Sequence, residues 1–136
     1  TCTTKVLKPL QVLQNRNVKI LSHKNRYDSS TALLKEHRIL NCKQLNTYFI
    51  SIFVYKHQKS DLPHVFQNYF TKNSETHNRN TRQVDDLHLI RFRTNYGQKS
   101  IRYIGATVWN GLPKECKETN SLAQLKTNMK KLLLSQ

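Results

Sequence analysis

The stretch LHLIRFRTNYGQKSIRYIGATVWNGLP, from Leu87 to Pro113, decides the predicted fold, because it holds the clearest alternation of apolar and polar residues, the only Trp and all three glycines. Apolar and basic residues alternate twice within it, over 89–93 and over 100–104. A period of two is typical of a strand with one buried face. The residues between the two runs include Gly97, which can adopt positive φ. The pattern therefore predicts two antiparallel strands joined by a loop.

The two faces of this predicted hairpin differ in chemistry. One face carries the apolar residues Ile90, Phe92, Ile101 and Tyr103. The other carries the arginines Arg91, Arg93 and Arg102. Strand geometry would place the first two arginines about 7 Å apart, a spacing that suits successive backbone phosphates. An isolated hairpin is only marginally stable in water, so we expect helices to cover the apolar face and the arginine face to stay in solvent.

Net charge is the strongest signal in the composition. The 136 residues include 23 Lys and Arg against 8 Asp and Glu, which gives a net charge of +15 and a pI of about 10.1. The excess is spread along the whole chain rather than gathered in a terminal tail. Such a charge favours a polyanionic partner, and nucleic acid before any other. A solvated basic surface without a partner is the alternative.

No metal, disulfide or catalytic site is predicted. Cys2, Cys42 and Cys116 are far apart and have no His at metal-ligand spacing, and the six His are scattered. The chain has no Gly-rich phosphate loop, GxSxG or HExxH motif. Asp85 and Asp86 are the only adjacent carboxylates, a weak basis for metal-assisted phosphoryl transfer. The chain by itself is predicted to be a binding module without a cofactor.

Helices are predicted before and after the hairpin. The first, over 4–20, has an apolar face interrupted by Asn17 and formed by Val6, Leu10, Leu13 and Ile20. A short helix through 38 follows Ser29 or Ser30 and turns Leu33 and Leu34 inward. The last helix begins at Asn120 or Ser121. Its apolar stripe consists of Leu122, Leu125, Met129, Leu132 and Leu133, with Lys126, Lys130 and Lys131 outside.

The third predicted helix is expected to be the buried centre. It begins after Asn41 and ends at Asp61-Leu62-Pro63, because proline cannot continue a helix. Its apolar positions cover much of its circumference and are Leu45, Tyr48, Phe49, Ile52, Phe53 and Tyr55. A helical turn follows over 64–70, and another over 105–112 places Trp109 on the sheet as a core residue rather than a base-stacking one.

The region 71–86 is too polar to bury itself, since it holds one Val in sixteen residues. Its centre, His77-Asn78-Arg79-Asn80-Thr81-Arg82, is basic and rich in amides. A binding loop and a solvated linker are equally compatible with this composition. Because no signal peptide and no long apolar run are present, we expect an intracellular, soluble chain, and the start at Thr1 suggests a fragment.

Four motifs in order carry a resemblance to a known family. The first is LKPLQVLQNRNVKI over Leu7–Ile20, similar to "L..LQNRAVRII", and the second covers 30–56 and ends in an aromatic-rich helix with Val54-Tyr55-Lys56. The third, over 77–82, is similar to "H.YNTR", and the fourth, over 93–113, is similar to "RT.YG..S.RY.GP..WN.LP". With a final helix similar to "S...FK..LK..LL", the chain resembles the C-terminal end of the reverse transcriptase of non-LTR retrotransposons (LINE elements, jockey-like).

We expect a mainly α fold with a small antiparallel β-hairpin, an α+β architecture. Residues 1–70 would form a thumb-like helical bundle, 71–86 a basic polar loop, and 87–136 a subdomain of the hairpin and the C-terminal helix. The parent would be an RNA-directed DNA polymerase whose palm, with its aspartates and Mg²⁺, lies upstream. The resemblance also implies a location in the nucleus and cytoplasm, without a membrane partner.

The expected function is to bind RNA template, primer or target DNA beside that upstream catalytic palm. Guanidinium groups pair with phosphate oxygens in a two-donor geometry, so the predicted nucleic-acid-binding residues are Arg79, Arg82, Arg91, Arg93 and Arg102. Two alternatives stay open: a free-standing basic RNA- or DNA-binding module, and a helical module whose apolar stripes dock a protein.

Overall fold

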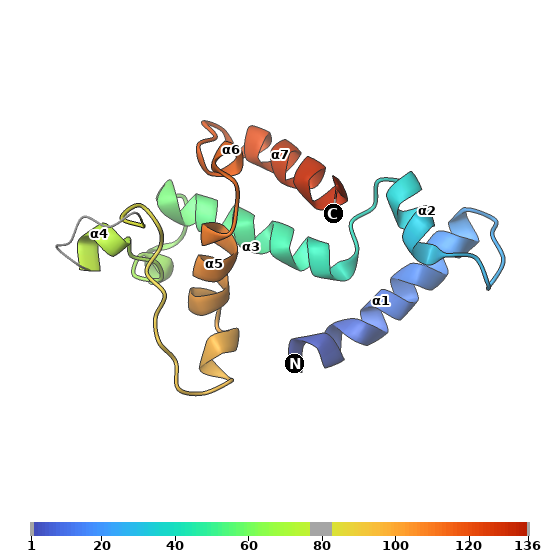
Figure 1. The fold of residues 1–136 in the computed structure, drawn as a ribbon, viewed down its shortest axis with the longest axis horizontal. Helices are drawn as coiled ribbons and strands as arrows, with labels where there is room; N and C mark the ends of the chain where they lie inside the picture. Colours follow the sequence, from blue (N-terminus) through green and yellow to red (C-terminus); the bar gives the residue numbers. More distant parts are fainter. Residues whose placement is uncertain (1, 77–82, 136) are drawn as a thin grey trace. The chain divides into compact units, whose positions relative to one another are not determined.

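The computed structural model describes residues 2–76 and 83–135, and these form a mainly helical protein (Figure 1). The helices are α1 (Cys2–Leu21), α2 (Ser30–Glu36), α3 (Cys42–Gln58), α4 (Asn73–Thr76), α5 (Ile101–Asn110), α6 (Lys114–Lys117) and α7 (Leu122–Ser135). Two short 3-10 helices, η1 (His64–Phe66) and η2 (Gly97–Lys99), lie between them. The mainly α part of the predicted fold class is confirmed.

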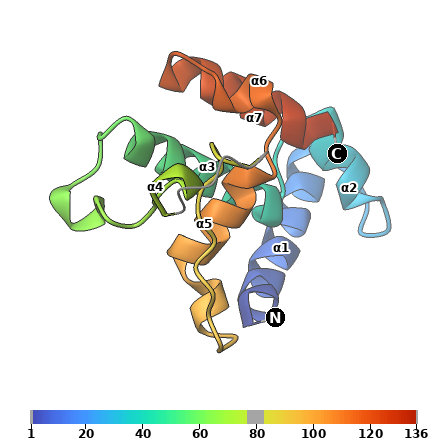
Figure 2. The ribbon, with the colours of Figure 1, turned by 60° about the vertical axis from the view of Figure 1, so that its left-hand side comes forward.

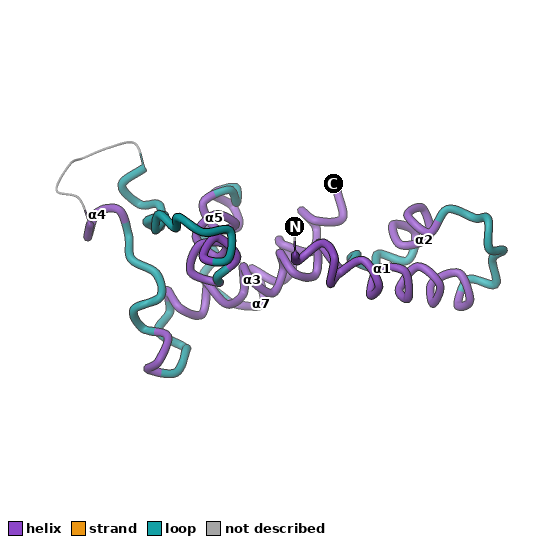
Figure 3. The backbone as a smooth tube through the Cα atoms, turned by 90° about the horizontal axis from the view of Figure 1, so that it is seen from below, coloured by secondary structure: helices purple, strands orange, loops and turns teal. Residues whose placement is uncertain are grey.

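The predicted β-hairpin is wrong. Within 2–76 and 83–135 no strand forms, as Figure 3 shows, and the only β-type pairing there is an isolated antiparallel bridge between Lys72 and Leu87. Residues 88–92 are irregular, and the second alternating run begins helix α5. Three alternating residues are too few to specify a strand. The buried residues Gly105, Ala106 and Trp109 that follow have helical spacing, and this longer pattern decides the structure.

Gly97 is needed for the space that it leaves rather than for a positive φ, since no described glycine has a positive φ. A Cβ at this position would lie 2.6 Å from Cδ1 of Phe92. The backbone N–H of Gly97 donates to Thr94 Oγ1 at 3.1 Å, so the predicted hairpin loop is instead a compact turn that leads into η2. The glycine lets this turn approach the Phe92 ring.

The described chain forms two compact units. Unit 1 consists of residues 1–48 and 127–136, and unit 2 of residues 49–126. Helices α3 and α7 each contribute residues to both units. These boundaries differ from the predicted segments 1–70, 71–86 and 87–136, which stay a prediction.

In unit 1, α1 and α2 lie side by side (Figures 1 and 2). Val18 of α1 packs in a buried cluster with Leu33 and Leu34 of α2, which confirms that the two leucines point inward. The predicted apolar face of α1 is wrong, because its four aliphatic residues are between 51% and 65% exposed. These residues are Val6, Leu10, Leu13 and Ile20.

A different face of α1 is held by polar contacts. The Gln14 side chain donates to the carbonyl of Leu40 at 2.8 Å, and Gln11 Oε1 accepts the backbone N–H of Cys42 at 2.9 Å. Buried or half-buried backbone groups need hydrogen-bond partners, so two glutamines can decide which side of a helix faces its neighbour. This is why Val18, rather than the predicted aliphatic stripe, enters the core.

Local capping explains where the helices begin and end. Asn41 and Gln44 exchange side-chain and backbone hydrogen bonds of 2.9 and 3.0 Å at the start of α3, which confirms Asn41 as its cap. Ser121 Oγ accepts the N–H of Gln124 at 3.2 Å at the start of α7. Helix α3 ends at Gln58, before Pro63, because Ser60 turns left-handed with φ 55° and the Asp61 N–H bonds the Lys56 carbonyl at 2.9 Å.

The core of unit 2 lies between the later part of α3, Phe70 and α5. Trp109 is only 3% exposed, which confirms it as a core residue. A Cβ on Gly105 would lie 2.6 Å from Cζ of Phe70 and 3.2 Å from Cγ2 of Val54, so glycine permits the close approach of α5. On α3 the buried positions are Ile50, Ser51, Val54 and Tyr55, whereas the predicted core residue Phe49 is exposed.

Helix α7 follows its predicted pattern. Leu125, Met129 and Leu133 are buried, and Lys126, Lys130 and Lys131 are exposed. The predicted polar loop contains the short helix α4. On the other side of the undescribed residues 77–82, the carbonyl of Val84 accepts the N–H of Ser74 at 3.1 Å. The basic centre of this loop, including Arg79 and Arg82, lies outside the described residues.

Candidate nucleic-acid interface

The three described arginines of the predicted site belong to unit 2 and are all exposed. Arg91 and Arg93 lie on the irregular segment that precedes η2, and Arg102 is the second residue of α5. No strand pairs these two segments, so the predicted row along a hairpin face does not exist in that form. Their shared solvent exposure agrees with the prediction, although the reason for it is different.

A contact between two aromatic rings links the segments that carry the arginines. Phe92 and Tyr103 have ring centroids 6.3 Å apart and an interplanar angle of 75°. Edge-to-face pairs of this kind are favourable beyond the area they bury. The prediction placed the two residues on one apolar face, and they do meet, as a loop residue against a helix residue. Their contact brings the neighbourhood of Arg91 and Arg93 to the start of α5.

Arg102 is oriented by a cation–π contact. Its guanidinium carbon lies 4.6 Å from the centroid of the Tyr69 ring, and that ring in turn packs edge-to-face on Phe66 with a centroid distance of 5.1 Å. Stacking uses the face of the guanidinium, whereas a phosphate is bound by the N–H groups at its edge. The contact with Tyr69 therefore holds Arg102 in place without occupying the groups that would bind a phosphate.

The charged residues near these arginines in the sequence are all positive. Between Leu87 and Pro113 there are four Lys and Arg and no Asp or Glu. The carboxylate that precedes this stretch, Asp86, is paired with Lys117 at 3.4 Å. Such a stretch keeps an unbalanced positive charge at the surface of unit 2, and that charge attracts polyanions.

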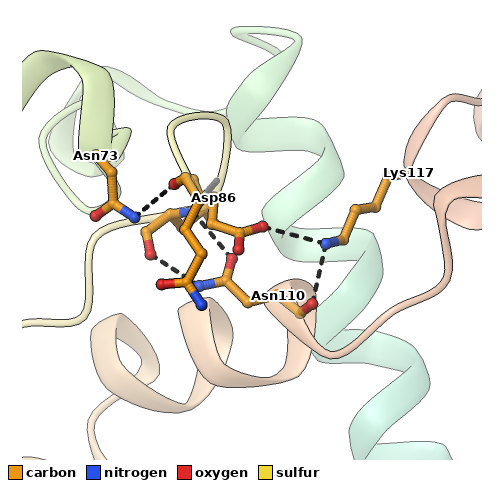
Figure 4. A network of polar contacts seen from close by, with 6 residues as sticks. Asn73, Asp86, Asn110 and Lys117 are labelled. Carbon is orange, nitrogen blue, oxygen red and sulfur yellow. Dashed lines mark hydrogen bonds and ion pairs between the residues drawn. The ribbon is translucent and has the colours of Figure 1, made fainter. Parts of the chain in front are cut away.

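A network of side chains anchors the basic segment at its start (Figure 4). The Asn110 amide, at the end of α5, accepts the N–H of Leu87 at 2.9 Å and donates to the carbonyl of the same residue at 2.8 Å. It thereby gives Leu87 the pair of bonds that a neighbouring strand would give. Lys117 Nζ donates to the Asn110 carbonyl at 3.0 Å as well as to Asp86.

The loop residues before Leu87 are tied to α4 in the same network. Asn73 donates two hydrogen bonds: its backbone N–H donates to the Asp86 carbonyl at 2.9 Å, and its side-chain amide donates to the Gln83 carbonyl at 2.8 Å. A groove of about 800 Å³ lies beside the network and is lined by Asn73, Gln83, Asp86, Leu87, His88, Leu89, Ile90, Arg91 and Asn110. The network explains why the Trp-Asn pair of the fourth motif is structural: Trp109 fills the core and Asn110 binds the backbone.

Two exposed tyrosines were missed by reasoning from the sequence. Tyr96 is 88% exposed and lies between Arg93 and Lys99 in unit 2. Tyr27 is 96% exposed and follows Arg26 in unit 1. An exposed aromatic ring between cations, as at Tyr96, is the arrangement with which proteins stack the bases of single-stranded nucleic acids, whereas Tyr27 has Arg26 on one side and Asp28 on the other. The signal in the sequence was a Tyr in a polar segment near basic residues.

Other chemistries have little support within the described part of the chain. No three His, Cys, Asp or Glu residues there are grouped so that they could hold a metal ion, and none of its helices is long and apolar enough to cross a membrane. Burial raises the pKa of the Cys116 thiol, and the nearby Glu115 carboxylate raises it further, which disfavours the thiolate form. Comparisons with protein families, with curated proteins and with solved structures find no match for this chain.

Proposed function

We propose that the chain binds the phosphate backbone of RNA or DNA and positions it beside the catalytic palm of a non-LTR retrotransposon reverse transcriptase, of which it would be the C-terminal part. The observation that supports binding is that Arg91, Arg93 and Arg102 are exposed and belong to a stretch, 87–113, that has no Asp or Glu. The family assignment rests on the four sequence motifs. Arg79 and Arg82, which lie outside the described residues, remain part of the proposed binding set.

The proposed binding is electrostatic and has little sequence preference. Each phosphate that is neutralised releases counterions, which contributes a slope of about −0.9 to log K against log salt on duplex DNA. No described element shows a constellation that reads base edges. We therefore expect similar affinities for unrelated oligonucleotides of about 30 nucleotides and a steep fall between low and physiological salt.

The test replaces Arg91, Arg93 and Arg102 together with Gln and compares salt slopes with those of the parent. Because all three side chains are exposed, the fold should persist, apart from a loss of about 0.5–1 kcal/mol for the Arg102–Tyr69 contact. The slope should become shallower by about 2–3. The matched control replaces the exposed Lys126, Lys130 and Lys131 with Gln, which removes the same charge from α7. Equal losses in both variants would mean that only net charge matters.

The enzymatic context needs a separate test. The genomic sequence immediately upstream should encode a palm motif of the (F/Y)xDD kind if the family assignment is right. A basic protein that binds nucleic acid but has no such motif upstream would instead be a free-standing RNA- or DNA-binding module.

A second candidate function is docking of a protein partner, and the exposed aliphatic face of α1 favours it. Four aliphatic side chains that recur on one side of a helix and remain more than half exposed are typical of a surface that another protein covers. The partner we propose is the upstream reverse-transcriptase domain. Replacing Leu10 and Leu13 with Ser should abolish co-purification with that domain and leave nucleic-acid binding unchanged.

A further inference from the structure

Unit 1 contains a cavity that the arginines of unit 2 do not share. It has a volume of about 460 Å³ and lies at the end of α1 and the turn that follows. Four of its seven lining residues are cations, namely Arg16, Lys19, Lys24 and Arg26. The others are Val12, Asn15 and Ile20, so no acidic residue lines it. A cavity with this lining is suited to an anion.

No carboxylate lines the cavity, although Asp28 belongs to the same turn. Unit 1 has eleven Lys and Arg against two Asp and Glu. One of these, Asp28, accepts the backbone N–H of Asn25 at 2.7 Å and so serves the turn itself. Like charges around one cavity repel each other, and a bound anion relieves that repulsion. The C-terminal end of a helix favours cations, which accounts for Lys19 and Lys24 but not for all four.

The turn that closes the cavity is held in shape. Lys19 Nζ donates to the Arg26 carbonyl at 2.6 Å, and Ser22 Oγ and His37 Nε2 of the chain after α2 are 2.8 Å apart. The N–H of Lys24 bonds the carbonyl of Lys19 at 3.0 Å, and His23 takes a left-handed φ of 50°. A site formed before binding loses less conformational entropy when the ligand arrives.

An exposed aromatic ring follows one of these cations in the sequence. Tyr27 directly follows Arg26 and is 96% exposed, and Val12 and Ile20 give the cavity an apolar wall. We propose that this site binds one nucleotide of a single-stranded nucleic acid, with the phosphate among the four cations and the base stacked on Tyr27. The inference rests on nucleic acid being the partner, as in the proposed function, but it places a second and independent site in unit 1.

A phosphate could also belong to a lipid headgroup, and the exposed aliphatic residues of α1 would then meet the membrane. The exposed tyrosine favours a nucleotide, because binding to a lipid surface does not require an aromatic ring on which a base can stack. Binding to vesicles of phosphatidylcholine and phosphatidylserine is therefore part of the test. Vesicle binding that depends on the cavity cations and exceeds binding to the oligonucleotide would overturn the proposal.

The first arm of the experiment tests the cavity with an anion alone. Pyrophosphate is titrated into the full chain and backbone amide shifts are followed by NMR. We expect the largest shifts between residues 16 and 27. In the variant Arg16→Gln, Lys24→Gln, Arg26→Gln these shifts should vanish, whereas the control Lys8→Gln, Lys35→Gln, Lys43→Gln removes the same charge from unit 1 and should keep them. Lys19 is left intact in both because it holds the turn. Equal responses of the two variants would refute an anion site at the cavity.

The second arm uses a single-stranded oligonucleotide of about 12 nucleotides and the corresponding duplex, since single-strand sites commonly span about 4–16 nucleotides. The cavity variant should bind the single strand about tenfold more weakly than the parent, and the control about threefold at most. Tyr27→Leu should weaken single-strand binding about fivefold or more and duplex binding less than twofold. A Tyr27 variant that binds like the parent would remove the stacking role and with it the nucleotide proposal.

The two proposals fail in different ways. If the parent binds oligonucleotides but the cavity variant and its control do so equally, the site in unit 1 is refuted while the proposed function stands. If the parent binds no nucleic acid, both are refuted. The pyrophosphate arm then shows whether the cavity takes an anion of another kind.

Discussion

Removing the Asn110 side chain should destabilise unit 2 more than its position at the end of a helix suggests. Leu87 is only 3% exposed, and both of its backbone polar groups are bonded to the Asn110 amide. Asn110→Ala leaves a buried N–H and a buried carbonyl without partners, each at a cost of about 1–3 kcal/mol. Allowing for partial relief by water, we expect a loss of about 2–4 kcal/mol from a typical total of about 5–15 kcal/mol.

The measurement is thermal and urea unfolding of Asn110→Ala beside the control Asn68→Ala, which removes an exposed amide from the same unit. A loss of this size should lower the melting temperature by about 3–5 °C per kcal/mol, and the control should change little. Amide hydrogen exchange of Leu87 should accelerate in the first variant. If both variants melt alike and the Leu87 amide keeps its protection from exchange, the two hydrogen bonds between Asn110 and Leu87 do not stabilise unit 2 as proposed.

The variant Asn110→Asp, which can keep one of the two hydrogen bonds to Leu87, makes the test sharper. The Asp carboxylate in Asn110→Asp can accept the N–H of Leu87 but repels its carbonyl, whereas a protonated Asp can donate to that carbonyl. The folded-state pKa of this Asp should therefore be raised above the usual value of about 3.9. Its stabilising contribution is present below the unfolded pKa and is lost as pH rises through the folded one. Relative to Asn110→Ala, the Asp variant should gain stability as the pH is lowered towards 4.

Three further predictions concern packing, a helix end and a thiol. Trp109→Ala should cost about 3–5 kcal/mol and lower the melting temperature before it alters any specific binding; a variant that melts like the parent but no longer binds would show that Trp109 contacts nucleic acid. Ser60→Gly should raise stability by about 0.5–1 kcal/mol in urea unfolding, because Ser60 is held at φ 55°. In a Cys2→Ser background, alkylation should reach Cys42 well before Cys116, since Cys116 is buried and its pKa is raised, and similar rates would contradict this burial. The contribution of the raised Cys116 pKa to the free energy of unfolding should fade as pH rises above the ordinary value of 9.0.

The helical elements were predictable where the local signals are strong. Asn41 at the start of α3 and Ser121 at the start of α7 use their side chains as caps, and this depends only on nearby residues. The hairpin failed because two short alternating runs carry little information, and the second run continues into a helical pattern ending at Trp109. The pattern over all ten residues of α5 determines that this segment is a helix, whereas its first three residues alone suggest a strand.

The orientation of α1 could not be predicted from its apolar pattern. Its aliphatic residues occur on more than one side, so the buried side is selected by contacts with residues far along the chain, such as the bond from Gln14 to Leu40. The candidate site shows the same limit. Arg91 and Arg102 are exposed as predicted, but the partner that orients Arg102 is Tyr69, which no local pattern connects to it.

The motif residues of unit 2 and its proposed binding residues are different sets. Gly97 makes room for Phe92, Gly105 makes room for Phe70, and Asn110 binds the backbone of Leu87. The fourth sequence motif therefore consists largely of residues that build the fold, and the arginines lie between them at the surface. Substitutions at the exposed cations can remove binding while these packing contacts stay intact. Function and stability can thus be tested by separate variants, and a loss of binding without a loss of melting temperature can be assigned to the surface itself.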